Sequence, residues 1–382
     1  MTEALSPDAI QARHSRLGRV RDRMGEEGVD VLLLSHGADL PWLTGYEAMP
    51  LERLTLLVLP LEGVPVLVVP GLEAPRVPEA GGLVELRPWS DAEDPLAIVG
   101  GLLAHRSHRR LALSDRAWAT TAFGLQRTLP GAEWIEASTV TSPLRAVKDA
   151  AELAALRAAG AAADRVAAVL QTGGIPLIGR TEAAVSADLS ALLVAEGHRS
   201  VNFAIVGSGP NAASPHHEPG ERIIGPRETV VCDFGGTFAL EGDVGYCSDI
   251  TRTVVTGEPS PEVSEAYAVL HAAQAAGVSA ARAGVTAASV DAAARSVIEA
   301  AGLGDLFVHR TGHGIGIEEH EDPYLVAGND ELLQVGHAFS VEPGIYAPDR
   351  FGMRLEDIVI VGFDGAPDPL NVADHHLAVV DA

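Results

Sequence analysis

The pattern of hydrophobic and polar positions divides the chain into two parts. In the first part, apolar runs alternate with amphipathic stretches such as residues 16–28, and the runs are VDVLLLS at 29–35, LTLLVLP at 54–60 and VPVLVVP at 64–70. Short apolar runs bounded by Pro and Gly are typical of buried strands. We therefore predict a smaller α/β domain over residues 1–145.

After residue 145 the pattern changes to pairs of helices followed by strands. Helices are predicted at 150–172 and 181–196, the second between the capping residues Thr181 and Gly197. The same order recurs with helices at 261–283 and 286–301, and extended segments follow each pair, over 201–255 and 307–362. This repetition predicts a second domain over residues 146–382, built from two related halves around a sheet.

Composition and charge exclude several classes of protein. The 382 residues are 47% hydrophobic, which is enough for two cores, yet no apolar run reaches the roughly 20 residues that cross a bilayer. The segment MTEALSPDAI has no signal-peptide pattern, so we expect a cytoplasmic protein. A net charge of -25 argues against binding to nucleic acid or to an anionic membrane.

Polar residues interrupt the predicted strands of the second domain. These candidates are Asp233, Asp249, His313, Glu342 and Glu356. Buried carboxylates need cationic partners, and either the nearby Arg252 and Arg354 or a pair of divalent metal ions could serve. Four carboxylates and one imidazole outnumber two arginines, and this donor set suits Mn²⁺, Co²⁺, Fe²⁺ or Zn²⁺. The spacing alone leaves both interpretations open.

Several motifs resemble a known family in their order and in most of their spacing. The strings SGPNAASPHH, DFGG, GYCSDITRT, HRTGHGIGIEEHE, VEPGIY and RLED are similar to those of the pita-bread metallopeptidases, over residues 200–362. Upstream, LRAVKDAAELAALRAA and DLPWLTGY resemble the prolidase and aminopeptidase P branch. The resemblance implies an α+β fold, in which two pseudo-symmetric ααβ halves surround a curved antiparallel sheet.

The resemblance also implies roles for individual residues. Asp249 and Glu356 would bridge two metal ions, Asp233 would bind one ion, and His313 with Glu342 would bind the other. His216, His309 and His320 would contact substrate, with His320 near the developing oxyanion. Glu342 would also relay a proton. Apart from the resemblance, Arg354 lies two residues before Glu356 and should share its face of the strand, so we expect Arg354 to support that ligand. The segment 310–324 would be a strand whose glycines leave room for substrate.

The implied activity is hydrolysis of the Xaa-Pro bond in dipeptides or short peptides, with two divalent ions, Mn²⁺ or Co²⁺ in first place and Zn²⁺ or Fe²⁺ as alternatives. Three other functions stay open: aminopeptidase P-like cleavage of longer peptides, hydrolysis of a non-peptide C–N bond as in creatinase, and a non-catalytic binding module. The expected partners are short proline-containing peptides and a second copy in a homodimer. The loop from His36 to Tyr46, with Trp42 or Asp39 at its tip, is expected to close over the partner's site.

One departure from the family pattern concerns the two aspartates. They lie sixteen residues apart rather than about eleven, and the insert FALEGDV supplies another acid, Asp243. We expect Asp233 to lie opposite Asp249 in a hairpin with the three-residue loop 240–242. Asp243 would then lie near the tip of the hairpin, too far from the metal ions to bind them.

Overall fold

The computed structural model describes residues 5–78, 82–104 and 109–380. The chain divides into two compact units. The first comprises Met1–Arg145 with Leu240–Val244, and the second comprises Ala146–Ala239 with Gly245–Ala382. In the described residues, no helix is both long and apolar enough to cross a membrane.

The first unit is a six-stranded mixed sheet with helices on both faces. Its strand order is β4-β3-β2-β1-β5-β6, in which β1–β2 and β2–β3 are antiparallel and the other pairs are parallel. The strands are β1 (Val31–Leu34), β2 (Leu56–Pro60), β3 (Val66–Pro70), β4 (Glu85–Trp89), β5 (Arg110–Leu113) and β6 (Glu133–Glu136). The helices are α1 (Pro7–Glu27), α2 (Asp39–Thr44), α3 (Pro95–Leu103), α4 (Ala119–Thr128) and α5 (Ser138–Ala146), with a 3₁₀ turn η1 (Ala74–Arg76).

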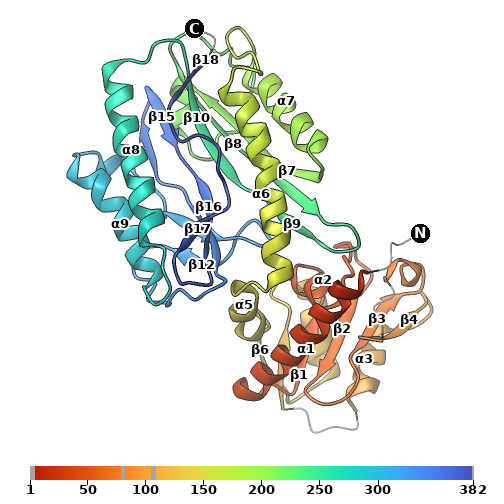
Figure 1. The fold of residues 1–382 in the computed structure, drawn as a ribbon. Helices are drawn as coiled ribbons and strands as arrows, with labels where there is room; N and C mark the ends of the chain where they lie inside the picture. Colours follow the sequence, from red (N-terminus) through yellow and green to blue (C-terminus); the bar gives the residue numbers. More distant parts are fainter. Residues whose placement is uncertain (1–4, 79–81, 105–108, 381–382) are drawn as a thin grey trace. The chain divides into compact units, whose positions relative to one another are not determined.

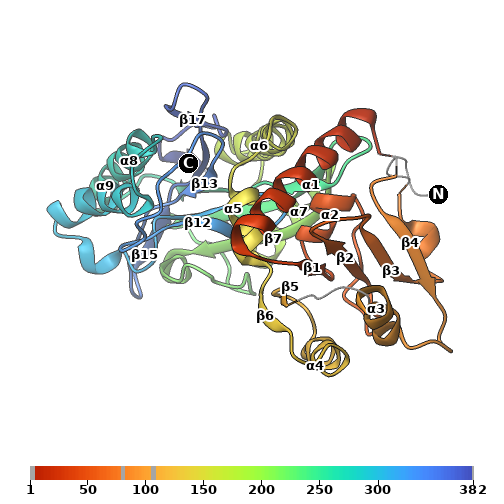
Figure 2. The same ribbon diagram turned by 90° about the horizontal axis from the view of Figure 1, so that it is seen from below.

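Alternation along the strands explains the two helical layers of this unit. Val31 and Leu33 belong to a buried cluster with Val99 of α3 and Leu125 of α4. Successive strand residues face opposite sides of the sheet, so Leu32 and Leu34 face away from this cluster. Figure 2 shows α1 and α2 on that other side of the sheet. The predicted α/β pattern of this region is therefore present.

The expectation for the loop from His36 to Tyr46 is wrong in one respect. Most of this segment forms the short helix α2, and Trp42 is fully buried there rather than exposed at a tip. The Arg16 guanidinium lies 5.7 Å from the Trp42 ring centroid and donates a hydrogen bond to the Trp42 carbonyl oxygen at 3.1 Å. Asp39 pairs with Arg145 at 2.9 Å. Both residues thus serve the interior of the first unit.

The second unit contains two successive sets of two helices and several strands (Figure 1). The first set is α6 (Ala150–Gln171), α7 (Glu182–Ala195), β7 (His198–Ser208), η2 (Gly209–Ala213), β8 (Thr229–Ala239), β9 (Gly245–Cys247) and β10 (Ile250–Thr256). The second set is α8 (Pro261–Ala280), α9 (Ala287–Ala300), η3 (Gly304–Leu306), β11 (Gly312–Gly314), β12 (Glu321–Leu325), β13 (Ala338–Val341), β14 (Gly344–Ala347), β15 (Phe351–Arg354), β16 (Asp357–Val361), β17 (Pro367–Pro369) and β18 (Ala378–Val380).

Matching details relate the two halves. Thr181 caps α7 by accepting a hydrogen bond from the Ala184 N–H, and Thr286 caps α9 by accepting one from the Ser289 N–H. Each capping threonine also forms an isolated antiparallel bridge, to Ile223 in the first half and to Leu332 in the second. The predicted repetition of two helices and strands is confirmed.

The strands of the second unit form two five-stranded sheets and a two-stranded ribbon. One sheet has the order β18-β10-β8-β7 with β9 paired to β8, the other has the order β12-β11-β13-β16-β17, and β14 pairs with β15. All these pairs are antiparallel except β10–β18. The Glu356 N–H donates to the Thr251 carbonyl oxygen at 3.2 Å, which joins the two large sheets at their centre.

Alternation assigns each strand residue to the helical core or to the opposite face. Val230, Cys232 and Phe234 pack in one cluster with residues of α6 and α7, so Asp233 faces the other way. In the second half, Phe339 and Val341 pack in a cluster with Val290 of α9. The carboxylates and imidazoles of the strands therefore gather on the face away from the helices.

The predicted register of the β8 hairpin is wrong by two residues. Asp233 pairs with Thr251, not with Asp249, and Ala239 pairs with Gly245. The loop consequently spans the five residues 240–244, and Gly242 within it has a φ of 71°. A shift of two residues keeps every side chain on its original face, so Asp233 and Asp249 still point to the same side.

Candidate metal centre

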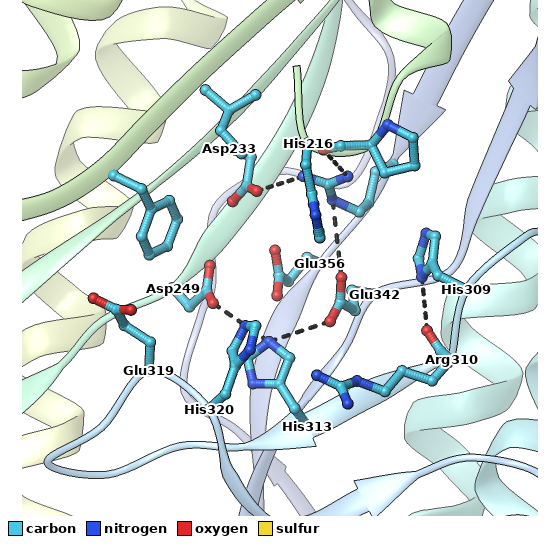
Figure 3. A pocket seen from close by; sticks show the side chains of 14 residues that line it. His216, Asp233, Asp249, His309, Arg310, His313, Glu319, His320, Glu342 and Glu356 are labelled. Atoms are coloured by element: carbon cyan, nitrogen blue, oxygen red, sulfur yellow. Dashed lines mark hydrogen bonds and ion pairs between the residues drawn. The ribbon is translucent and has the colours of Figure 1, made fainter. Parts of the chain in front are cut away.

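The polar face of the second unit surrounds a pocket of about 480 Å³. All nine residues singled out from the sequence line it: His216, Asp233, Asp249, His309, His313, His320, Glu342, Arg354 and Glu356. Asp233, His313 and Arg354 lie in strands and the others in the segments next to strands, and Figure 3 shows the labelled side chains converging on the pocket from both halves. The two sheets thus bring together residues separated by more than a hundred positions in the sequence.

Three buried side chains form a group that could hold a metal ion. One ligand atom each of Asp249, His313 and Glu356 lie within 4.8 Å of one another. The Thr251 hydroxyl donates to Glu356 Oε2 at 2.6 Å and so fixes this carboxylate. Glu342 adjoins the group, because its Oε1 lies 3.2 Å from His313 Nε2.

The hydrogen bonds of His313 identify which of its nitrogens faces the carboxylates. Nδ1 lies 3.1 Å from the Gly314 carbonyl oxygen, which can only accept, so Nδ1 carries a proton. In neutral imidazole Nε2 then presents a lone pair, and it points at Asp249 (3.7 Å) and Glu342 (3.2 Å). A lone pair beside two carboxylates is repulsive unless a proton or a metal ion lies between them.

Asp233 is held from one side only. Its Oδ2 accepts a hydrogen bond from Arg354 Nη2, while Oδ1 is buried and has no hydrogen-bond partner among the described residues. Arg354 also donates from Nε to the Thr251 hydroxyl at 3.0 Å and from Nη1 to the Tyr346 hydroxyl at 2.9 Å. One oxygen of Asp233 is therefore left for a cation in the pocket.

The pKa values of the carboxylates show that their charges are not compensated. Burial and then the charges of neighbouring carboxylates raise the pKa of Asp249 and that of Glu356 well above their ordinary values. Burial also raises the pKa of Asp233, against the opposing effect of Arg354. For Glu342, burial is outweighed by the hydrogen bond and charge of His313, which lower its pKa to about 2.

These observations fit a divalent metal centre. The pocket holds five carboxylates against two arginines, and three of the five have raised pKa values. Oxygen donors with one imidazole nitrogen match the preferences of Mn²⁺, Co²⁺, Fe²⁺ or Zn²⁺. The unpartnered Asp233 Oδ1 and the inward lone pair of His313 are the atoms that such ions would contact.

His309 is engaged within the protein through both ring nitrogens. Nδ1 donates to the Arg310 carbonyl oxygen at 2.7 Å, so Nε2 is left to accept from the Tyr346 hydroxyl at 2.9 Å. Burial raises the pKa of Tyr346 to about 12, which keeps its proton in place for this bond. Both ring nitrogens of His309 thus have partners within the protein, and its expected contact with substrate stays a prediction.

The ring nitrogens of His320 and His216 form no hydrogen bond among the described residues, whereas His217 Nε2 does. The ring centroid of His320 lies 3.9 Å from that of His313. His320 is an exposed residue whose ring is partly buried; this partial burial, followed by the positive charges of His313 and Arg310, lowers the pKa of His320 to about 4, so the imidazole is neutral at pH 7. His217 lies outside the lining, with Nε2 2.8 Å from Glu182 Oε2.

The expectations for the segment 310–324 need correction. It is a hairpin of β11 and β12 rather than one strand. Its three glycines face protein atoms: Gly312 and Gly314 make room for neighbouring backbone, and Gly316 makes room for the Glu321 side chain. A Cβ on Gly312 would lie 1.9 Å from the Ser340 carbonyl oxygen, and one on Gly314 would lie 2.2 Å from that of Asp322.

Five further residues line the pocket that the sequence had not singled out. They are Phe203, Ile205, Pro215, Arg310 and Glu319. Arg310 and Glu319 flank the metal-site histidine in the sequence, and that proximity is the one signal that could have identified them. The apolar residues come from β7 and the turn after η2, where only the folded structure brings them to the pocket.

Comparisons with known proteins agree over nearly the whole chain. Residues 152–362 match metallopeptidase family M24, and residues 16–147 match the creatinase/prolidase N-terminal domain. The chain is 45% identical to the probable dipeptidase PepE of Mycobacterium tuberculosis over 368 aligned residues. This alignment covers 96% of each chain.

Two solved structures extend this similarity to the fold. Dipeptidase PepE from Mycobacterium ulcerans has a TM-score of 0.89 and 45% identity, covering 97% of this chain and 98% of that one. A prolidase from Thermococcus sibiricus has a TM-score of 0.87 and 34% identity, covering 96% and 98%. The predicted pita-bread fold with a smaller N-terminal domain is confirmed.

Proposed function

The chain belongs to metallopeptidase family M24, and from this premise we propose that it hydrolyses the Xaa-Pro bond of dipeptides with two divalent metal ions, Mn²⁺ or Co²⁺ in first place. It is a metallopeptidase, and its similarity to proteins named dipeptidase and prolidase supports the class of substrate. The observation that carries the proposal is the cluster of buried, uncompensated carboxylates around His313.

The residues that would hold the two ions are Asp233, Asp249, His313, Glu342 and Glu356. Asp249 and Glu356 lie with His313 in the three-residue cluster, and the pKa values of both carboxylates are raised well above their ordinary values, so they would be the first to gain from a bound cation. When bound, the ions would supply a nucleophilic water at neutral pH and polarise the scissile carbonyl.

Glu342 would move the proton during hydrolysis. Its Oε1 accepts from the Ser340 hydroxyl at 3.1 Å and adjoins His313, whereas Oε2 lies 4.0 Å from Arg354 Nε, beyond hydrogen-bond distance. Oε2 can therefore accept a proton from water and deliver it to the leaving nitrogen, which for an Xaa-Pro bond is the imine nitrogen of proline.

His320 would meet the charge that develops on the carbonyl oxygen. As a neutral imidazole at pH 7 it carries one N–H, which can donate to that oxygen without a prior change of protonation. His216 faces the same pocket and would hold the substrate in place. The apolar side chains of Phe203, Ile205 and Pro215 offer surface on which a pyrrolidine ring can pack.

The comparison of Ala-Pro with Ala-Pro-Ala tests the substrate class. A cavity of about 480 Å³ suits a small ligand better than an extended peptide, so kcat/KM should be higher for the dipeptide. Faster cleavage of the tripeptide would favour an aminopeptidase P-like enzyme. No cleavage of either peptide, with cleavage of a non-peptide C–N bond such as that of creatine, would contradict the proposal.

We further propose that the enzyme acts in the cytoplasm as a homodimer on short proline-containing peptides. The support is the resemblance to the prolidase branch, which is usually dimeric. Sedimentation equilibrium of the purified protein measures its mass directly. A mass of one chain, 39.7 kDa, at micromolar concentration would contradict the dimer.

A further inference from the structure

Lys148 is the only lysine of the chain, and it is buried in the second unit. Its side chain is 1% exposed, and its ammonium group pairs with the carboxylate of Glu321, whose side chain is 8% exposed. A buried ion pair is weak evidence of a contribution to stability, because removing two charges from water can cost as much as their attraction returns. The pair therefore calls for an explanation other than the stability of the fold.

The backbone at Lys148 is attached beside the start of β13. The Lys148 N–H donates to the Gly336 carbonyl oxygen at 2.9 Å, and the preceding residue, Val147, forms an isolated antiparallel bridge with His337. Burial, followed by the charge of Lys148, lowers the pKa of His337 to about 4, so His337 is neutral at pH 7. Of these two basic side chains, Lys148 is thus the one that carries a positive charge at this edge of the sheet.

Glu321 begins β12 and closes the loop of residues 315–320, which connects β11 to β12. Glu321 pairs with Gly314 across the hairpin, and a Cβ on Gly316 would lie 2.4 Å from Glu321 Oε1, so the carboxylate lies against the base of the loop. In the sheet, β11 lies between β12 and β13. The Lys148 side chain therefore reaches from the start of β13, past β11, to the base of this loop.

His320 is the last residue of the same loop and directly precedes Glu321. It is an exposed residue whose ring lies against that of His313, and its ring nitrogens form no hydrogen bond among the described residues. At the other end of the loop, the Gly316 carbonyl oxygen accepts a hydrogen bond from the Cys247 N–H at 2.7 Å. The position of His320 therefore depends on how firmly Glu321 is held.

We propose that Lys148 is a positioning residue for hydrolysis, whose ion pair with Glu321 holds the base of the loop 315–320 so that His320 presents its N–H to the substrate carbonyl oxygen. This inference rests on the proposed function and adds a residue that lies outside the lining of the pocket. A donor to a developing oxyanion must be in place before the reaction, and a displacement of about 1 Å lowers the rate strongly. A charged hydrogen bond restrains the loop in one geometry, whereas apolar contacts are non-directional.

Lys148→Met keeps the length of the side chain and removes its charge. In the enzyme loaded with Mn²⁺, this variant should lower kcat for Ala-Pro about 10- to 100-fold, because a misplaced donor stabilises the transition state less. KM should stay within about threefold, and the bound metal should be unchanged. Lys148→Arg, which keeps the charge, should recover part of kcat. A wild-type kcat in Lys148→Met would overturn the inference.

A double-mutant cycle with His320→Ala tests whether Lys148 acts through His320. If it does, Lys148→Met should change kcat by less than about threefold once His320 has been replaced. Two losses that multiply would overturn the inference and leave the role of His320 intact. A wild-type kcat in His320→Ala, or wild-type protein that does not cleave Ala-Pro, would overturn the proposed function and the inference with it.

Amide hydrogen exchange of the metal-free protein gives a readout that does not depend on activity. In Lys148→Met, exchange should be at least about tenfold faster in peptides covering residues 315–325 and unchanged in β8 and β10. Arg222→Met is the matched control, because Arg222 and Glu228 form a partly buried ion pair of the same unit outside the pocket lining, with side chains 27% and 22% exposed. The control should change neither kcat nor exchange over 315–325. Unchanged exchange over 315–325 in Lys148→Met would overturn the inference.

A second variant covers the case in which Lys148→Met does not fold, because that substitution leaves Glu321 as an uncompensated buried charge. Lys148→Met combined with Glu321→Gln removes both charges, so the stability of the protein to urea should return toward the wild-type value. The kcat of this double variant should stay about 10- to 100-fold low, because the loop is still not held. A kcat restored to the wild-type value would show that the pair only compensates charge, and would overturn the inference.

Discussion

Two of the pocket carboxylates, Asp249 and Glu356, are buried to a similar degree as Glu182 but in opposite surroundings. Asp249 and Glu356 are 4% and 1% exposed, and Glu182 is fully buried. Glu182 accepts hydrogen bonds from the Ser208 N–H (2.8 Å), the Ser208 hydroxyl (2.7 Å) and Asn211 Nδ2 (3.0 Å), with His217 Nε2 at 2.8 Å. Burial alone would raise its pKa, yet these bonds lower it.

The difference teaches that burial does not by itself identify a metal ligand. A carboxylate surrounded by donors is complete without a cation and stabilises the fold, as Glu182 does. A carboxylate surrounded by other carboxylates has a raised pKa and needs a cation, as Asp249 and Glu356 do. Removing one acid of each kind should therefore have opposite consequences for activity and for stability.

The largest effect is expected for Glu356→Gln. It should lower kcat/KM for Ala-Pro by about a thousandfold or more, since one of the proposed metal ligands is lost. The metal-free variant should be no less stable than the metal-free wild-type protein, because one uncompensated buried charge has been removed. Activity assays with metal analysis, and urea unfolding in chelator, measure the two quantities. A metal-free variant less stable by more than about 2 kcal/mol would show that Glu356 is primarily structural.

Glu182→Gln should show the reverse. We expect a loss of about 3 kcal/mol of unfolding free energy, because several donors lose their charged acceptor, with metal content unchanged. Urea unfolding of the metal-free proteins gives the first number and metal analysis the second. Loss of bound metal at unchanged stability would place Glu182 with the pocket carboxylates and remove the contrast.

The stability difference between wild type and Glu182→Gln should depend on pH. The folded pKa of Glu182 lies below the unfolded value of about 4.3, so its stabilising contribution is fully present above that pH. It is lost as pH falls through the folded pKa. Unfolding free energies at pH 7, 5 and 3.5 should therefore show a constant difference at the first two values and a smaller one at the third. A difference that grows toward low pH would contradict the sign.

The smallest effect on activity is expected for Asp243→Ala. Asp243 lies in the hairpin loop, within the first unit, and pairs with the fully buried Arg13 at 2.6 Å. Its loss should leave metal content unchanged and kcat within about threefold. It should cost roughly 1–2 kcal/mol of stability, since Arg13 loses a partner that is 21% exposed. Loss of metal in this variant would require the ligand set to be redrawn.

The sequence was most informative where local periodicity determines the outcome. Alternation along β8 places Cys232 in the core against the helices and Asp233 in the pocket. The error of two residues in the hairpin register did not change the side of the sheet on which either residue was predicted. Capping residues likewise marked the start of α7 correctly at Thr181.

Partners that meet only in the tertiary structure escaped prediction. Trp42 was expected at a loop tip because its contact with Arg16 cannot be inferred from either segment alone. Glu182 resembles any acid in the first turn of a helix until its donors Ser208 and Asn211 are brought to it. Arg310 and Glu319 attracted no attention for the same reason, since the pocket that they line forms only in the folded chain.

The most direct test of the central claim is reconstitution of the metal-free enzyme. Protein stripped by chelator should cleave Ala-Pro at less than about one hundredth of the loaded rate. Activity should return as Mn²⁺ or Co²⁺ is added, reaching its maximum when two ions are bound per chain by metal analysis. Full activity in excess chelator, with no transition metal bound, would contradict the account.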